Sequence, residues 1–439
     1  MPLTPPPAPP AAVAQPLAAP AVPTATTQTA TTQTLAPEDA AALLMQARDF
    51  KNARKLLNDL ERRHYKPSEV EFLLAMLDMQ DHDYDGAVRL LRRILVREPG
   101  VIRVRLELAR AFFAKGDYLN AERQFRLARA GQPPPAVIAN IDAYLYAIRR
   151  LKRYAYNMSV AVAPDTNLNA GPSVESVTLY GLPFQLSSAA KQQSGIGGAV
   201  TAGGEWSPPL GSAVKFRLGG EFSGSFYGQS AFDDVFVTGY SGVRITLPRW
   251  DFDVLANAAK RWFGGAAFLT SVGPGVDATY HVSGRTGVSL AFNWNNVQYP
   301  YLGYQSGPVA STTAQIFYAP TPVSLVSVNA TLSRQASNSP GWANWSEQIG
   351  VEYIRDLKGG ITFAIAPSYT HFGYDVLVPA FGVRRVDNFV NVRVSLLDRA
   401  VDIHGFTPRV SYIFSNNASN VPLYAFGRNR VEIGVTNMF

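Results

Sequence analysis

The strongest constraint on the fold is the alternation of polar and apolar residues that continues from about residue 154 to residue 439. Val288, Phe292 and every second residue between them are apolar, whereas Ser289 and Asn293 are polar. A period of two is that of a β-strand whose two faces meet different surroundings. In a soluble sandwich the apolar face points inward, but in a membrane barrel it points to lipid and the polar face lines the lumen.

Several features favour the membrane barrel. The alternating segments are about 10–15 residues long, whereas strands of soluble proteins average about 5–6. Charged residues make up 17% of the chain, below the roughly 25% of soluble domains. No segment reaches the roughly 18 consecutive apolar residues of a membrane helix, and without helices only a closed barrel satisfies the backbone in lipid. Aromatic residues also gather near the strand ends, as in interfacial girdles: Tyr227, Trp250, Trp262, Phe263, Tyr299, Tyr301, Trp342, Trp345, Phe372 and Tyr374.

The pattern predicts fourteen strands, an even number as bacterial barrels require, with twelve or sixteen as the alternatives. The predicted strands span about 154–163, 195–206, 213–226, 234–247, 250–263, 268–281, 285–299, 308–319, 322–335, 343–356, 360–373, 384–397, 404–416 and 424–439. Short Pro/Gly turns alternate with longer loops, which predicts short turns in the periplasm and longer loops outside. Phe439 after an alternating strand resembles the signal read by the barrel-assembly machinery, which is therefore an expected partner.

Residues 38–153 have a different pattern, with apolar residues three and four apart. Ala53, Ala87 and Ala121 are 34 residues apart, and apolar residues follow each at plus four and plus seven. This period resembles that of the tetratricopeptide repeat. Three units and an extra helix, about Pro135–Arg150, are expected to form a short solenoid. Such solenoids bind peptides or proteins far more often than they catalyse reactions.

Composition limits the remaining possibilities. The chain contains no cysteine, which rules out disulfides, cysteine-based zinc sites and an N-terminal lipid on cysteine. Residues 1–37, rich in Pro, Ala and Thr, are expected to be a disordered lead-in, and they lack the pattern of a signal peptide, so we infer that one was removed or replaced. About +6 of the formal charge of +7 falls in residues 38–153. That charge could attract acidic partners or lipid headgroups or be merely solvated, but no motif indicates nucleic acid.

Patterns that would carry chemistry are weak. Asp81–Gly86 begins like a calcium loop, but the twelfth position, which needs a bidentate Glu, is Arg92. His371 lies near a strand end without a nucleophile pattern beside it. No cofactor fingerprint occurs in a credible context. We therefore expect no catalytic, cofactor or metal site, and we expect that the protein is not an enzyme.

One polar segment is distinctive. Asp165, Asn167 and Asn169 alternate where the first strand is expected to end. Asx side chains often bond to nearby backbone and fix turns, so this segment is a candidate gating or structural motif. The loop that follows, up to Ser194, is the longest in the barrel region and could cover or enter the lumen.

The repeats, the fourteen strands, the final Phe and the stretch Pro164–Ala170 together resemble one family, the surface lipoprotein assembly modulators of type XI secretion. The resemblance covers about residues 38–439. It implies an outer-membrane translocon with its repeats in the periplasm, delivering client lipoproteins or secreted haem- and metal-scavenging proteins to the surface. Outer-membrane lipid and a periplasmic chaperone are further implied partners. A lateral exit would need a weak seam between the first and last strands. The alternatives are a polysaccharide exporter of the repeat-plus-barrel type and a passive porin.

Overall fold

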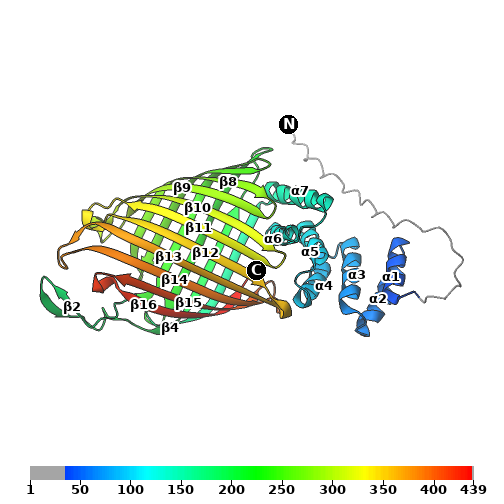
Figure 1. Cartoon of the computed structure of the whole chain (residues 1–439), viewed down its shortest axis with the longest axis horizontal. Coiled ribbons are helices and arrows are strands. Elements are labelled where there is room, and N and C mark those ends of the chain that lie inside the picture. The colour runs from blue at the N-terminus through cyan, green and yellow to red at the C-terminus, as the bar shows by residue number, and fades with distance from the viewer. Residues whose placement is uncertain (1–34, 438–439) are drawn as a thin grey trace.

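A computed structural model describes residues 35–437, and in it a helical region adjoins one end of a β-barrel (Figure 1). Most of the predicted lead-in and the predicted assembly signal at Phe439 lie outside these residues. The described residues form seven α-helices before the barrel: α1 (Pro37–Gln46), α2 (Phe50–Arg62), α3 (Pro67–Gln80), α4 (Tyr84–Arg97), α5 (Ile102–Lys115), α6 (Tyr118–Ala130) and α7 (Pro135–Leu151). No helix in this part of the chain is long and apolar enough to cross a membrane.

The 34-residue period reappears in the geometry of the helices. The predicted small residues Ala53, Ala87 and Ala121 are all fully buried where helices touch. At the same spacing Asp49, Asp83 and Asp117 cap α2, α4 and α6, and each carboxylate accepts a hydrogen bond from the backbone N–H three residues on. These caps satisfy N–H groups that the first helical turn leaves unpaired. The structure therefore confirms the internal repeat, and the tetratricopeptide resemblance fits it.

The residue before each of these aspartates also repeats in conformation. Arg48, His82 and Gly116 have φ values of 60°, 62° and 85°. Only the third position has the glycine that this left-handed region favours. The backbone conformation at this position thus repeats in all three units, although the residue type does not.

Fourteen strands form one closed antiparallel barrel, as predicted, with consecutive strands paired and β1 closing against β16. They are β1 (Tyr154–Asp165), β4 (Gly195–Trp206), β5 (Val214–Tyr227), β6 (Asp234–Thr246), β7 (Trp250–Phe263), β8 (Ala266–Ser283), β9 (Thr286–Gln298), β10 (Gly307–Thr321), β11 (Ser324–Gln335), β12 (Asn344–Asp356), β13 (Ile361–Val378), β14 (Val383–Asp398), β15 (Thr407–Ser419) and β16 (Phe426–Thr436).

Side chains alternate across the barrel wall as the sequence predicts. On β9, Leu290 and Phe292 are exposed on the outside, while Asn293 on the inside accepts a hydrogen bond from Asn257 of β7 at 3.0 Å. On β16, Ile433 points outward and is exposed, while Glu432 is buried. An apolar outer face around a polar interior is the arrangement of a membrane barrel, because only a closed sheet satisfies its backbone in lipid.

The loops differ in part from the prediction. We call the end next to the helices the helix-side rim and the opposite end the distal rim. Two expected distal loops are mostly strand, because β8 begins at Ala266 and β13 continues to Val378. One expected short turn on the helix side, between β14 and β15, is an eight-residue connection, 399–406. The long loop after β1 contains a separate hairpin, β2 (Ser176–Leu179) and β3 (Leu182–Gln185), which lies at the distal end in Figure 1.

Candidate functional site

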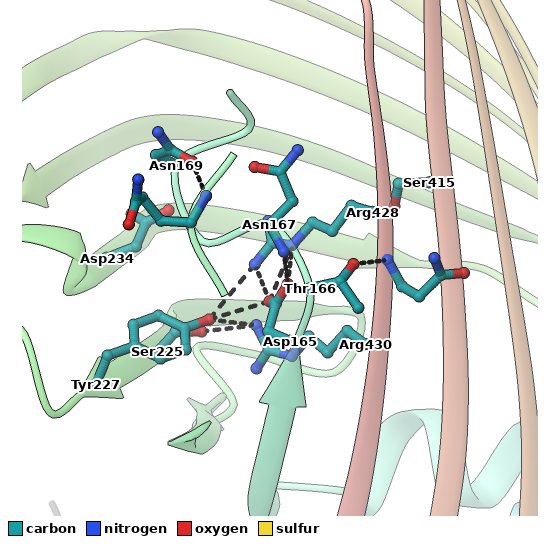
Figure 2. A network of polar contacts seen from close by, with 12 residues as sticks. Asp165, Thr166, Asn167, Asn169, Ser225, Tyr227, Asp234, Ser415, Arg428 and Arg430 are labelled. Carbon is teal, nitrogen blue, oxygen red and sulfur yellow. Dashed lines mark hydrogen bonds and ion pairs between the residues drawn. The ribbon is translucent and has the colours of Figure 1, made fainter. Parts of the chain in front are cut away.

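The candidate site is the seam where β1 meets β16, since the predicted motif Asp165–Asn169 lies at its distal end (Figure 2). Asp165 is the last residue of β1, and its side chain is fully buried. Arg428 of β16 donates from Nε to Oδ1 and Oδ2 of Asp165 at 3.0 and 2.9 Å, and from Nη2 to Oδ2 at 2.5 Å. Charge-assisted bonds of this bidentate kind are among the strongest in proteins. The first and last strands are therefore clamped together at the distal end.

A third strand joins this clamp. The hydroxyl of Tyr227, at the end of β5, donates to Oδ2 of Asp165 at 3.3 Å. Arg430 of β16 donates to the Tyr227 hydroxyl at 3.3 Å and to Ser225 Oγ at 3.0 Å. Because β5 is separated from β1 by β4, these bonds cross the barrel interior instead of following the ladder. The clamp therefore ties both sides of the seam to the wall beyond it.

Asn167 and Asn169 form the turn that leaves β1. Asn167 is fully buried, and its Nδ2 donates to the carbonyls of Gly171 and Gly427 at 2.9 and 3.0 Å. Asn169 Nδ2 donates to the Lys191 carbonyl at 2.8 Å. A Cβ on Gly171 would lie 2.8 Å from backbone atoms of 191–192, so glycine permits this close approach. Asn167 thus bonds across the seam, while Asn169 holds the far end of the long loop.

Within residues 35–437 the seam has the fewest ladder pairs of any two neighbouring strands of the barrel. Five residue pairs join β1 to β16, from Ser159↔Thr436 to Asp165↔Arg430, whereas twelve join β1 to β4. The β16 ladder has no pair at Ala163 or Pro164, and proline has no N–H to donate. Backbone pairing is therefore interrupted next to the distal end of the seam, where polar side chains join the two strands.

Polar side chains also hold the helix-side end of the seam. Arg409 of β15 donates to Ser159 Oγ at 2.7 Å and to Glu432 Oε2 at 3.4 Å. Asn437 Oδ1 accepts from the Met158 N–H at 2.7 Å. Side-chain bonds therefore join the strands at the distal end of the seam and again next to its last described residues.

A second polar cluster fixes the helical region to the barrel. Asp356 lies at the helix-side end of β12. Its carboxylate forms ion pairs with Arg105 of α5 at 2.9 Å, with Arg123 of α6 at 3.2 Å and with Arg399 at 3.6 Å. The side chains of Arg105 and Asp356 are 0% and 1% exposed. Burial lowers the pKa of Arg105 to about 10 despite the attraction of Asp356. Three arginines around one buried carboxylate make this contact the centre of the junction.

The junction is extended by a lysine of the barrel. Lys215 of β5 is buried, and its Nζ donates to the carbonyls of Arg149 and Lys152 at 2.7 Å each. These carbonyls end α7, where a cation also complements the helix dipole. The direction in which α7 leaves the barrel is thus set by a side chain of the barrel wall.

The other sequence patterns occupy structural positions. Asp83 of the calcium-like segment caps α4, and Asp81 pairs with Arg54 at 2.8 Å. His371 Nδ1 lies 3.0 Å from Asn388 Oδ1 on β14. Within residues 35–437 no group of three or more His, Asp or Glu side chains is arranged to hold a metal ion.

Sequence reasoning identified Asp165, Asn167 and Asn169 but missed the residues that they meet. Arg428 and Tyr227 lie 263 and 62 positions from Asp165, and no local pattern marks them. The only signal available was register: β16 and β1 must meet in a closed barrel, so polar inward residues of β16 were candidates.

We expect Asp165→Asn to weaken the distal clamp and to lower the temperature at which the barrel unfolds by several degrees. The amide keeps the shape but loses the charge that attracts Arg428, and hydrogen bonds to charged groups contribute about 1.5–3 kcal/mol. The measurement is the heat-dependent loss of the fast-migrating folded band in SDS gels. Asp234→Asn is the control. Asp234 also forms a bidentate pair with an arginine, Arg261, at 2.8 and 2.7 Å, but this pair lies on β6 and β7, outside the seam, and the Asp234 side chain is about a third exposed. An equal shift in both variants would contradict a special role for Asp165.

Comparison with known proteins gives consistent results for the barrel and for most of the chain. The sequence model of the family described as surface lipoprotein assembly modifier matches residues 154–439. Surface lipoprotein assembly modifier 1 of Haemophilus influenzae is 20% identical over 386 residues, which cover 85% of this chain and 79% of that protein. The protein of the same name from Neisseria meningitidis serogroup B is 22% identical over 396 residues, covering 83% and 75%.

Solved structures resemble the barrel region only loosely. The outer-membrane channel DcaP of Acinetobacter baumannii has a TM-score of 0.38 at 11% identity, covering 65% of this chain and 98% of that one. OmpF of Salmonella typhi in complex with daunomycin has a TM-score of 0.37 at 10% identity, covering 64% and 96%.

Proposed function

The chain belongs to the surface lipoprotein assembly modifier family, and on that premise we propose that it is an outer-membrane translocon that carries lipoproteins from the periplasm to the cell surface. The family supports a role in surface lipoprotein assembly. The observation that carries the proposed mechanism is the β1–β16 seam, where the ladder is interrupted at Ala163 and Pro164 and polar side chains join the strands. The clients we propose are lipoproteins or soluble haem- and metal-scavenging proteins.

We propose that the helical region lies in the periplasm. The longest connection of the barrel is the distal loop after β1, 166–194, and long loops are typical of the outer face. The helices lie at the other end of the barrel, with α6 and α7 next to it (Figure 1). The solenoid would then meet a client, or a chaperone carrying it, before the client reaches the barrel. The barrel-assembly machinery and outer-membrane lipid complete the proposed partners.

The proposed route leads through the seam. A client that keeps its lipid anchor in the bilayer needs a path that connects the lumen with lipid, and only an opening between neighbouring strands provides one. Because the ladder between β1 and β16 has no pair at Ala163 or Pro164, this seam opens at a lower cost in hydrogen bonds than an uninterrupted ladder would. In this proposal the clamp centred on Asp165 closes the gate after passage.

The direct test is deletion of the gene followed by protease treatment of intact cells. We expect a few lipoproteins to lose surface exposure while their whole-cell amounts stay the same, because synthesis and anchoring precede the step that this chain performs. Quantitative mass spectrometry of the protease-released peptides measures the loss.

The control is the deletion strain supplied with the wild-type gene, which should recover exposure. Loss of a surface glycan with every lipoprotein still exposed would favour the polysaccharide exporter instead. A steady open-channel conductance of the purified protein in planar bilayers, with no surface lipoprotein lost from the deletion strain, would favour the porin.

A further inference from the structure

Side chains that face the lumen are buried at the helix-side end of the barrel and exposed further in. Lys215 of β5, Asp251 of β7 and Asp356 of β12 all face inward at this end, and they are 5%, 5% and 2% exposed. Deeper in the lumen, Gln315 of β10 and Glu352 of β12 also face inward, but both are exposed. The lumen is therefore hollow behind a mouth that is closed.

Helix α6 covers part of this mouth. Its Arg123 pairs with Asp356 at 3.2 Å. The guanidinium of Arg126 lies 4.4 Å from the centre of the Phe317 ring, which faces inward from β10. Because residues three apart share one face of a helix, both arginines extend from the same side of α6 into the mouth. Ala319, the next inward residue of β10 toward the rim, is only 1% exposed.

The helices are held on opposite walls of the barrel. β5 and β12 are seven strands apart in a closed ring of fourteen. On β12, Asp356 pairs with Arg105 of α5 and Arg123 of α6. On β5, Lys215 donates to two carbonyls at the end of α7 at 2.7 Å each. The layer formed by α5, α6 and α7 therefore spans the width of the mouth, next to the barrel end in Figure 1.

The two sides of this layer are attached in different ways. On the β5 side α7 ends at Leu151 and β1 begins at Tyr154, so the chain itself joins the helices to the barrel. Lys215 holds the same end of α7 from the wall. On the β12 side the attachment depends on side chains, with the carboxylate of Asp356 at its centre. The first side has the properties of a hinge, and the second has those of a latch.

Beside the seam, the barrel closes the mouth with its own side chains. Arg409 of β15 reaches past β16 to the hydroxyl of Ser159 on β1, at 2.7 Å. Ser395 and Ser411 bond to each other at 2.8 Å between β14 and β15. All three serines are buried. The helices therefore complete a closure that the strands near the seam begin.

We propose that α5, α6 and α7 form a hinged lid that closes the helix-side mouth of the lumen, with its hinge at 151–154 and its latch at Asp356. A large molecule that enters the lumen from this side must first lift the lid. Release at Asp356 frees the latch side and leaves the helices joined to the barrel at the hinge. This inference goes beyond the proposed function and does not depend on it, because a lid closes the lumen whatever passes through.

A cysteine under the lid reports its opening, since the chain has no cysteine of its own. Ala319→Cys places a thiol at the buried position on the latch half of the mouth. The thiol is treated with a water-soluble methanethiosulfonate reagent in the purified full-length chain, in neutral detergent, and mass spectrometry follows the reaction. We expect slow modification, and modification about a hundredfold faster when Asp356→Ala is added, because removing one partner of a buried ion pair is strongly destabilising.

A second reporter distinguishes a hinged lid from helices that leave the barrel altogether. Thr246 of β6 is 2% exposed and faces inward beside the hinge, opposite Asp251 in the ladder. Its hydroxyl has no hydrogen-bond partner within residues 35–437, so Thr246→Cys removes no bond. Addition of Asp356→Ala should accelerate modification of this thiol less than about fivefold, the limit expected from the loss of a surface contact.

Two further variants control for the latch. Asp402→Ala removes the exposed partner of Arg92 and should accelerate modification of Ala319→Cys less than about fivefold. Arg123→Gln leaves Asp356 paired with Arg105 and should accelerate it about tenfold, as expected for one bond to a charged group. The fast-migrating folded band in SDS gels verifies that the barrel of each variant is intact.

Three results would overturn the proposal. Rapid modification of Ala319→Cys without any other change would show that the mouth is open. Unchanged modification after Asp356→Ala, or an equal effect of Asp402→Ala, would show that Asp356 is not the latch. Equal acceleration of the two reporters by Asp356→Ala would show that the helices leave as a whole, without a hinge.

Discussion

A disulfide across the seam, introduced by Ser159→Cys and Thr436→Cys, is expected to abolish delivery of lipoproteins to the surface. The two residues are Cα partners in the β1–β16 ladder, and both side chains are buried on the inner face. A covalent bond there prevents the strands from separating, whatever the state of the clamp at Asp165. Because the chain has no other cysteine, the bond forms only at this place. Protease treatment of intact cells, before and after a reducing agent, measures delivery.

The same cysteine supplies the control. Ser159 is also the Cα partner of Thr201 on β4, so Ser159→Cys with Thr201→Cys locks a neighbouring pair of strands without touching the seam. Both double variants lose the bond from Arg409 to Ser159. The seam variant also loses the bond from Thr436 Oγ1 to the Met158 carbonyl, and comparison with the reduced seam variant controls for that loss. Delivery should continue in the β1–β4 variant and resume in the seam variant after reduction. Undiminished delivery through a fully formed seam disulfide would show that clients do not leave through the seam.

The barrel was predictable because its rule is local. Each strand has one face toward lipid and one toward the lumen, so alternation alone located Val288 and Phe292 on the outside and Asn293 on the inside. Loop lengths were less predictable, because mainly apolar segments such as 266–269 and 373–378 extend strands beyond the expected rim. Nothing in an alternating pattern states where a strand stops.

The contacts of the candidate site were less predictable than its residues. Asp165 and its two asparagines stood out because three Asx residues alternate at a strand end. Their partners depend on closure of the barrel, which sets residues more than two hundred positions apart beside each other. The partners of Asp356 were equally unpredictable. In the sequence Asp356 is an ordinary residue at the end of a strand, and its arginine partners on α5 and α6 reach it only when these helices pack against the barrel. A charge pattern predicted a basic solenoid, but not which arginine would be buried.

Asp356→Ala is expected to detach the helical region from the barrel while leaving the barrel folded. The change removes the one carboxylate that faces Arg105, Arg123 and Arg399. Breaking a buried ion pair by removing one partner costs about 3–5 kcal/mol, because the other charge stays buried without compensation. Arg105 can escape that cost only if α5 leaves the rim. Circular dichroism at 222 nm should therefore show the helices melting at lower temperature, with no change in the heat-dependent migration of the barrel.

The exposed ion pair of the same junction is the matched control for this effect. Asp402→Ala removes the partner of Arg92, and these two side chains are 42% and 27% exposed, so the expected cost is below about 1 kcal/mol. Combining Asp356→Leu with Arg105→Met should recover part of the lost stability, because an apolar pair of similar volume replaces the buried Arg105–Asp356 pair at little cost, while Arg123 and Arg399 still lack the carboxylate. If Asp402→Ala lowered the helical melting temperature as much as Asp356→Ala, the buried cluster would not be what holds the junction. If the apolar pair restored docking of the helices, burial of apolar surface would be enough to stabilise the junction. The ion pairs would then serve mainly to determine which surfaces of the helices and the barrel meet.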